Sequence, residues 1–505
     1  MVYLQKKRIY NIKRLTTTIC LFTSLLLGYA QHTVRLNLAK TIELANESSL
    51  AAFRHKNMYL SSYWEYRTYK ANRMPSLTLD LMPAQYYRYI TQRYDSDSDT
   101  DVYRLQQMFS ASGGLSIHQN FDWLGGTFYI DSNLEYMRNF GETKSTQFSS
   151  IPLRIGYSQS LIGYNAFRWE RKIEPLKFER AKKEFIYNTE VLSQEAVRHF
   201  FNLAMAQADH RLAKENMTST DTLYKIGLER QKIAAISQAD LLTLQLDRVN
   251  AQNTLENAQM VLKRATFALA LFLNMDKDTK IEIDLPGRPH DISIPVEEAL
   301  EMAKTNNPQY LHQRQNILEA ERNVNKTRVE SRLNASVNAS VGFNQVAETF
   351  KGAYSNPLHQ ELASVSISIP LVDWGVRKGK YNMAKNNLNV AKIAARQEEI
   401  NLEEEVSMTI NDFIIQKRMI ASAEEALELA EIAYNQTKKR FIIGKADVSS
   451  LTLSLARQQE AQKNYISSLQ NYWLNYYKIR QLTLHDFATG ISLADRFDFD
   501  NGKYR

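Results

Sequence analysis

The sequence predicts an α+β fold that is mostly α and is built from two internal repeats. Two long segments that are nearly free of proline predict helices longer than those of ordinary globular domains. Shorter segments alternate apolar and small polar residues, which is typical of strands. The stretch "RFIIGKADVSSLTLSLARQQEAQ" (440–462) also has a counterpart 210 residues earlier, "RQKIAAISQADLLTLQLDRVNAQ" (230–252). Duplication on this scale sets the architecture of a chain.

Residues 1–30 have the pattern of a secretory signal peptide. Five basic residues within 6–14 precede an apolar run from Ile19 to Leu27, and small residues follow in "GYA" (28–30), as a cleavage site requires. We therefore expect the mature protein to be exported. Cys20, the one cysteine of the chain, lies in this segment, so the mature protein is expected to have no disulfide, cysteine metal site or cysteine nucleophile.

Removal of the signal also changes the charge balance. The chain has 63 basic and 55 acidic residues, and the loss of five basic ones leaves 58 against 55, a net charge of +3. So small an excess gives little reason to expect nucleic-acid binding, and we expect none. No later stretch has 18 consecutive apolar residues, so no transmembrane helix is expected.

The first repeat is expected to cover residues 31–275. It begins with a helix, continues with strands within 76–161, and ends in a long helical hairpin, 165–274. Along the return limb of this hairpin, residues spaced alternately three and four apart are apolar, except for Arg248. Such a 3.5-residue period indicates a left-handed coiled-coil seam. The seam consists of Leu241, Leu244, Arg248, Ala251, Leu255, Ala258, Leu262, Ala265, Leu269 and Phe272.

A linker with several prolines, residues 276–295, leads to the second repeat, 296–482, and a C-terminal tail follows at 483–505. The second repeat is expected to contain a helix, two strands and a helical hairpin at 375–482. Its proline-free run, 375–443, could extend roughly 100 Å at 1.5 Å per residue. A helix of this length indicates a coiled-coil-like partner.

The two strands of the second repeat, 333–345 and 363–371, alternate without interruption. Alanine, valine and isoleucine occupy one face, and asparagine and serine occupy the other. This pattern suits a barrel strand with lipid outside and water inside. A half-buried sheet of a soluble protein would have the same period, so the pattern by itself leaves both possibilities open.

Motifs that could carry chemistry are incomplete. "GVRKGK" (375–380) has too few residues between its glycines for a phosphate loop, and Tyr381 follows where Ser or Thr is needed. "DSDSDTD" (95–101) has calcium-loop spacing, but Thr100 and Gln106 replace the required glycine and glutamate. A solvated acidic loop is preferred there, with loose divalent binding as the alternative. No histidine pair or Gly-x-Ser-x-Gly elbow occurs, so we expect no catalytic residue, metal site or cofactor, and no enzyme.

The order of these elements resembles the TolC-type outer-membrane efflux protein family. The most specific segments are "ISIPLVDWGVRKGKYNMAKNNL" (367–388), "ALEMAKTNNP" (299–308) and "RFIIGKADVSSL" (440–451). The resemblance implies a homotrimer whose protomers each give four strands to one outer-membrane β-barrel. Their helices continue as an α-helical coiled-coil barrel through the periplasm of a Gram-negative bacterium.

The resemblance also implies partners. The hairpin tips close the far end of the tunnel and dock onto a periplasmic adaptor (membrane fusion) protein, which joins an inner-membrane RND or ABC transporter. The barrel contacts outer-membrane lipid. Small molecules or proteins would leave the cell through this exit duct without chemistry, in a tripartite efflux or type I secretion system.

The repeated stretch is then interpreted as the two hairpin tips of one protomer. Gly444 can form a sharp turn, because glycine adopts positive φ at low cost, whereas the first tip has Ala234 at this place. Arg230 and Arg440 come before the two turns and are candidate adaptor contacts. The alternative is that they form exposed intrahelical pairs.

The gate is expected among residues of these tips. Asp240 matches an acidic latch position of the family, but Phe441 and Ala446 stand where the family has tyrosine and arginine. Ser450 and Leu453 stand where it has an acidic ring. The candidate gate residues are Asp240, Phe441, Gly444, Lys445, Asp447 and Ser450.

Two questions stay open at the level of sequence. The first repeat has an additional pair of strands, and "FDWLGG" (121–126) resembles the "VDWGV" corner (372–376), so an inserted hairpin could widen the barrel or stand above it. The competing class of protein is an exported periplasmic coiled-coil scaffold without channel activity.

Overall fold

The computed structural model describes residues 33–97, 99–140, 144–233, 236–289, 291–499 and 503–504. The predicted signal peptide (1–30) and Ala234 lie outside these residues. The chain forms two compact units. The strand unit comprises Met58–Glu184 and Asn307–Leu402, and the helical unit comprises the described residues of Met1–Asn57, Phe185–Asn306 and Glu403–Arg505. Each unit is described separately below.

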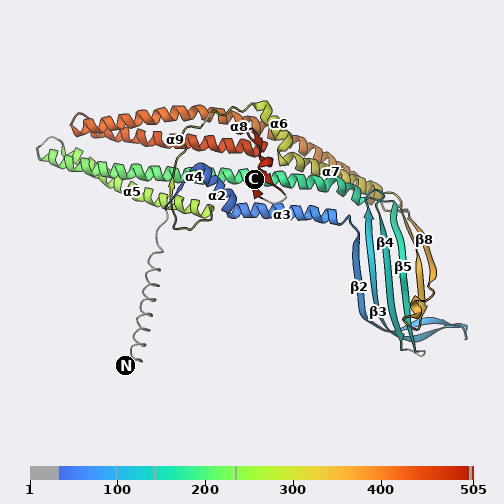
Figure 1. Ribbon diagram of the computed structural model, residues 1–505. Coiled ribbons are helices and arrows are strands. Elements are labelled where there is room, and N and C mark those ends of the chain that lie inside the picture. Colours follow the sequence, from blue (N-terminus) through green and yellow to red (C-terminus); the bar gives the residue numbers. More distant parts are fainter. Residues whose placement is uncertain are drawn as a thin grey trace, which may run out of the picture. The chain divides into compact units, whose positions relative to one another are not determined.

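Six antiparallel strands of the strand unit form a single sheet (Figure 1). Their order is β2-β3-β4-β5-β7-β8, so four strands of the first repeat continue directly into two strands of the second. The additional hairpin therefore belongs to the sheet. The strands are β2 (Ser76–Asp95), β3 (Thr100–Phe121), β4 (Gly126–Asn139), β5 (Ser145–Ile162), β7 (Asn334–Ala347) and β8 (Leu358–Ser368).

Several strand boundaries differ from the prediction. The acidic loop expected at 95–101 is shorter, because β2 continues to Asp95 and β3 begins at Thr100. The strand expected at 363–371 runs from Leu358 to Ser368, shortly before Pro370, which has no N–H group for the ladder. The sheet also continues one residue past the predicted limit of 161, to Ile162.

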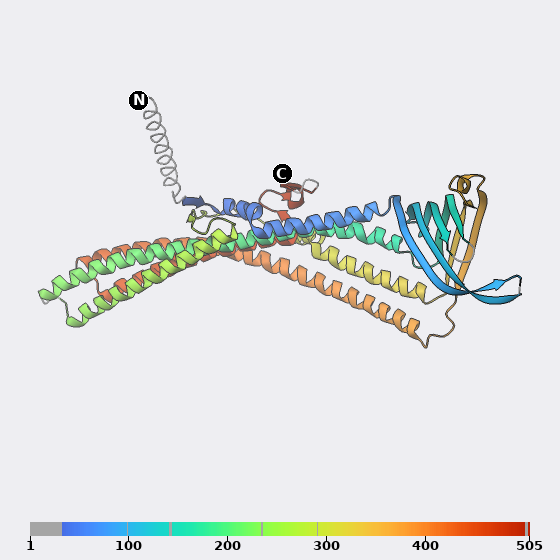
Figure 2. The same ribbon diagram turned by 90° about the horizontal axis from the view of Figure 1, so that it is seen from below.

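Beyond the sheet, β2 and β3 form a two-stranded ribbon (Figure 2). Pairing of β3 with β4 begins at Met108, whereas β2 and β3 remain paired up to Asp95 and Thr100. Two paired strands without a third are of marginal stability, and Arg104 adds an ion pair with Asp95 at 3.0 Å.

The strand register places aliphatic side chains on one face of the sheet. Leu79 pairs with Leu115, Ile117 with Ile130, Ile155 with Val341, and Val337 with Val365. This apolar face is largely exposed, and its further members include Leu77, Leu81, Leu153 and Ile367. An exposed apolar face of this extent is the feature expected of a lipid-facing wall.

The opposite face of the sheet is polar. Arg154 on β5 donates two hydrogen bonds to Asp131 on β4, from Nε at 3.0 Å and from Nη2 at 2.8 Å. Serines and asparagines extend the same face onto β7, where Ser158 donates to Asn338. This composition is that of a wall in contact with water.

The helices come in two long hairpins. The first consists of α4 (Ala166–Lys232) and α5 (Gln238–Phe272), and the second of α8 (Val376–Ile442) and α9 (Val448–Thr483). Shorter helices are α2 (Leu38–Ser48), α3 (Leu50–Ala71), α6 (Val296–Asn306) and α7 (Pro308–Glu330). Among the helices that the structure describes, none combines the length and apolar character needed to cross a membrane.

A small parallel two-stranded sheet joins the start of the first repeat to the linker. Strand β1 (Thr33–Leu36) pairs with β6 (Lys280–Ile283) within the predicted linker. Near the C-terminus, β9 (His485–Asp486) pairs with β10 (Ile491–Ser492), and β11 (Phe497–Asp498) pairs with β12 (Lys503–Tyr504). These segments pack beside the hairpins of the helical unit, as shown by the ring contact of Phe185 with Phe497 at 4.5 Å.

A buried ion pair fixes α9 against α4 in the helical unit. Arg480 donates to Glu190 at 2.9 Å and is 3.4 Å from Asp486. Burying a lone charge is costly, so the two carboxylates compensate the guanidinium. Between α8 and α9, the rings of Phe413 and Tyr472 lie 4.7 Å apart in the core.

Arg73 joins three elements of the strand unit. Its Nε donates to Asp122 at 2.9 Å in the β3–β4 turn, and its Nη2 donates to the carbonyl of Phe167 at 3.3 Å in α4. The "FDWLGG" segment is therefore a turn held between the end of α3 and the start of α4, and Gly125 within it has φ of 75°.

We expect Gly342→Ala to destabilise the sheet by about 1–3 kcal/mol. A Cβ atom at this position would lie 2.5 Å from the carbonyl oxygen of Leu153 and 2.8 Å from Cα of Arg154, both backbone atoms that cannot move aside alone. The measurement is the unfolding temperature of the detergent-purified protein.

Gly379→Ala in α8 is the matched control for this prediction. A Cβ atom there would meet nothing within 4 Å, and alanine is the better helix former by about 1 kcal/mol. Equal unfolding temperatures for the two variants would contradict the close approach of β5 and β7.

Candidate functional site

The second hairpin turns sharply at Gly444. Gly444 has φ of 77°, and the N–H groups of Gly444 and Lys445 donate to the carbonyls of Phe441 and Arg440 at 3.0 and 2.8 Å. A left-handed residue after the last helical turn is a common way to end a helix, and glycine adopts it most easily. This is the turn expected from the sequence.

The helices that follow the two turns, α5 and α9, each start with one serine and one aspartate. The residue type that caps the helix in one tip lies three residues after the cap in the other. In the first tip, Ser237 is the N-cap and Asp240 completes a capping box, with the Asp240 N–H donating to Ser237 Oγ at 3.1 Å. In the second tip, Asp447 is the N-cap and accepts from the Ser450 N–H at 2.7 Å. The repeat offset of 210 aligns Ser237 with Asp447 and Asp240 with Ser450.

Both acidic candidates, Asp240 and Asp447, therefore form capping hydrogen bonds at the N-terminus of the helix to which they belong. Hydrogen bonds from the Ser237 side chain and backbone hold the pKa of Asp240 below its ordinary value. Hydrogen bonds from Ser450 do the same for the pKa of Asp447. Each carboxylate remains charged at neutral pH and stabilises the positive end of a helix.

Arg230 connects the first hairpin to the second. Its Nη2 donates to the carbonyl of Ile442 at 3.0 Å, and its guanidinium carbon is 5.9 Å from the centre of the Phe441 ring. One turn of helix further from the tip, Lys438 of α8 donates to Ser219 of α4 at 2.8 Å. The two hairpins are thus joined by polar contacts close to their turns.

Arg440 has a different position although it aligns with Arg230. Its Nη2 donates to the carbonyl of Lys445 at 3.3 Å, within its own turn. The two arginines that the sequence presents as equivalent therefore have separate structural roles, one between hairpins and one within a hairpin.

Phe441 belongs to the small core of the tip. It is 6% exposed and packs in one cluster with Leu223, Leu244 and Leu451. Gly227 permits this packing, because a Cβ atom there would lie 2.6 Å from the Leu244 side chain. Phe441 therefore stabilises the tip from inside.

Two isoleucines at the tips were not among the residues chosen from the sequence. Ile233 is 76% exposed and Ile443 is 64% exposed, and they occupy equivalent positions of the repeat. The signal was present, because both members of the aligned pair are isoleucine next to a turn, where a polar residue is expected. Their exposure became visible only in the structure.

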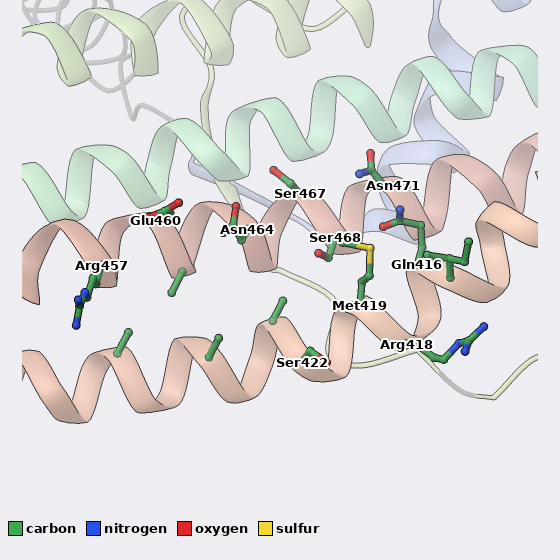
Figure 3. Close-up of a pocket in the computed structure, with 15 residues that line it drawn as sticks. Gln416, Arg418, Met419, Ser422, Arg457, Glu460, Asn464, Ser467, Ser468 and Asn471 are labelled. Carbon is green, nitrogen blue, oxygen red and sulfur yellow. The ribbon is translucent and has the colours of Figure 1, made fainter.

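A groove runs between α8 and α9 of the second hairpin (Figure 3). Its volume is about 970 Å³, and seven of its fifteen lining residues are alanine or serine, among them Ala426 and Ser468, with Arg457 and Arg418 toward opposite ends. Small side chains on both helices leave this space open. None of the residues selected from the sequence lines the groove.

Metal chemistry has no support at these positions. Within the described ranges, no group of three or more His, Cys, Asp or Glu side chains could hold a metal ion. This includes the described aspartates of the β2–β3 turn, Asp95, Asp97 and Asp99.

We expect Arg230→Ala to loosen the second tip by about 1 kcal/mol, the usual net contribution of one hydrogen bond. The corresponding change is a roughly fivefold faster amide exchange at residues 443–446, measured by hydrogen–deuterium exchange. Lys232→Ala is the control, because Lys232 forms an ion pair with Glu229 of its own helix end, at 2.7 Å. Equal effects of both variants at 443–446 would refute the contact between hairpins.

Part of the sequence matches a known protein family. Residues 299–483 match the family model described as "Outer membrane efflux protein". No curated protein matches the chain.

Solved structures share the fold at low sequence identity. The CmeC outer membrane channel of Campylobacter jejuni is 14% identical, with a TM-score of 0.65 over 92% of this chain and 88% of its own. VceC of Vibrio cholerae is 14% identical, with a TM-score of 0.61 over 89% of this chain and 95% of its own. The MtrE outer membrane channel of Neisseria gonorrhoeae, in its open state, is 13% identical, with a TM-score of 0.57 over 88% of each chain.

The family match and the fold exclude the periplasmic scaffold, since they account for the strands as well as the helices. The protein is located in the outer membrane and extends into the periplasm. Residues 299–483 thus match the outer membrane efflux protein family, whose TolC-type members are channels and not enzymes, and the chain as a whole has the fold of solved outer-membrane channels.

Proposed function

We propose that three copies of this chain form the exit duct of a tripartite assembly, with a periplasmic adaptor and an inner-membrane RND or ABC transporter as partners. The observation that carries the proposal is the sheet, which has one exposed apolar face and one polar face. A closed ring of such sheets would put lipid outside and a water-filled path inside.

The helical hairpins support the same assembly. Exposed aliphatic residues follow α5, among them Leu242, Leu246 and Val249, and others follow α8, among them Leu429 and Ile432. Exposed apolar stripes of this kind are costly in water and are usually covered by a partner helix. Neighbouring copies would cover them in a ring of helices.

The hairpin tips are the proposed docking surface for the adaptor. Ile233 and Ile443 expose apolar side chains at equivalent places, so a trimer would present six of them. Arg440 lies beside Ile443 and remains a proposed contact. Arg230 holds the two tips together, so its proposed role is to present both isoleucines in a fixed arrangement.

The proposed gate uses the turn of the second hairpin. Lys445 and Asp447 are the charged residues of this turn, and the Asp447 carboxylate already caps α9. Untwisting the tips on adaptor binding would change the distances between such charges on neighbouring copies. Asp240, Gly444 and Ser450 would contribute by shaping the two turns.

We expect Ile233→Asp together with Ile443→Asp to weaken adaptor binding at least tenfold without loss of the trimer. Each isoleucine buried at an interface contributes about 1.5–3 kcal/mol, and 1.4 kcal/mol corresponds to a factor of ten. Binding of the purified adaptor to the detergent-purified channel measures the effect.

Ile491→Asp is the matched control, since Ile491 is exposed but belongs to the C-terminal β10 segment. A trimer that keeps full adaptor affinity after both tip substitutions would exclude these isoleucines from the docking surface.

We expect Lys445→Glu to raise the conductance of the closed channel in planar lipid bilayers. The substitution places a second negative charge within two residues of Asp447, and like charges at this separation repel within the screening length of about 8–10 Å. Lys277→Glu, in the exposed loop after α5, should leave conductance unchanged. Equal conductance of wild type and Lys445→Glu would remove Lys445 from the gate.

A further inference from the structure

The sheet has two outer edges without a strand partner in the described part of the chain. Strands β2 and β8 are the first and last of the six, and no other strand in the described part of the chain pairs with their outer edges. Every residue of β8 is exposed except Gln360, which is intermediate. Inside a bilayer, water cannot satisfy the N–H and C=O groups of such edges, so a wall that crosses lipid must close on itself.

All six strands have the character of a membrane wall. Leu77 on β2 is 68% exposed and Ile367 on β8 is 61% exposed, and both lie on the apolar face. The same face continues across the hairpins of the first repeat through Leu115, Ile117 and Ile130. A hairpin standing above the membrane would have no reason to continue this face in register.

Strand direction also permits closure. Because the six strands alternate in direction, β8 runs opposite to β2. Copies related by rotation about the barrel axis would therefore meet with β8 antiparallel to β2 of the next copy. An even number of antiparallel strands is the rule for bacterial outer-membrane barrels.

We propose that the outer edge of β8 binds the outer edge of β2 of a second copy, and that three copies close a barrel of 18 strands. The number follows from six strands per copy in the sheet and from the proposed trimer, on which this inference rests. Four strands per copy, as the family resemblance implied, would give twelve.

A barrel of this size has a functional consequence. Barrel diameter grows roughly in proportion to strand number, so 18 strands give a pore about half as wide again as twelve, in the range where porins hold an open aqueous channel. The polar face, with serines on β8 and the Arg154–Asp131 ion pair, would line this pore. Selection by size would then depend on the helical part of the conduit.

Counting strands in a cryo-electron-microscopy cross-section of the purified protein in lipid nanodiscs tests the proposal directly. We expect 18 strands around a three-fold axis. A trimer with twelve strands, with β2 and β3 outside the wall, would overturn the inference and leave the proposed exit duct intact. A protein that stays monomeric in lipid would overturn both.

Disulfide trapping provides a second test, because the predicted mature chain has no cysteine. Double-cysteine variants would pair one position of β2 with one position of β8. The β2 positions are Ser76, Thr78 and Asp80, and the β8 positions are Ser364, Ser366 and Ser368. Within one chain these strands are five spacings apart, roughly 24 Å, far beyond the reach of a disulfide. Oxidation should therefore join copies into dimers and trimers on denaturing gels for at least one register.

Thr127→Cys on β4, combined with the same three β8 positions, is the matched control. It should give no cross-link, because β4 is paired on both edges, with β3 and β5, and cannot meet β8 of another copy in an 18-stranded barrel. Cross-links from Thr127→Cys, without any from β2, would mean that four strands per copy close the barrel and would overturn the proposal.

Discussion

Hydrocarbon offers no hydrogen-bond partner to a backbone N–H or C=O group, and the strand unit is organised by this constraint. Its strands bond to one another in a single register, and that register also decides which side chains face outward. A slip by one residue would move the aliphatic residues of a strand to the polar face. Backbone pairing and the apolar face are thus two results of one arrangement.

Irregularities in the ladder preserve the arrangement. The register shifts at four places along the wall: between Met82 and Gln85, between Asp131 and Asn133, between Ser160 and Ile162, and between Ser150 and Leu153. At the last of these, the β5 backbone comes so close to β7 that only Gly342 fits opposite. Bulges bend a strand locally, which a curved wall requires.

The helical unit is stabilised by a different set of contacts. Long helices satisfy their own backbone, so only their ends and side-chain faces need partners. At the tips, a serine–aspartate pair starts each return helix, with the two residues exchanged between the repeats. At the helix starts, duplication has therefore kept the physical task and exchanged the residues that perform it, whereas Arg230 and Arg440 are the same residue in two different roles.

Local features of the sequence determined the helices, the alternating strands, the duplication and the sharp turn at Gly444, because periodicity and backbone preference act within a few residues. The family match of residues 299–483 also agrees with these patterns in their order. Long-range partners could not be predicted in this way. Pairing of β5 with β7 joins residues about 180 positions apart, Arg230 has its acceptor on another hairpin, and Phe441 is buried by three other segments. These contacts, and the inclusion of the additional hairpin in one sheet, were decided by the tertiary structure. The residues next to a strand edge or an apolar side chain in the sequence do not specify which distant segment will pair with it or cover it.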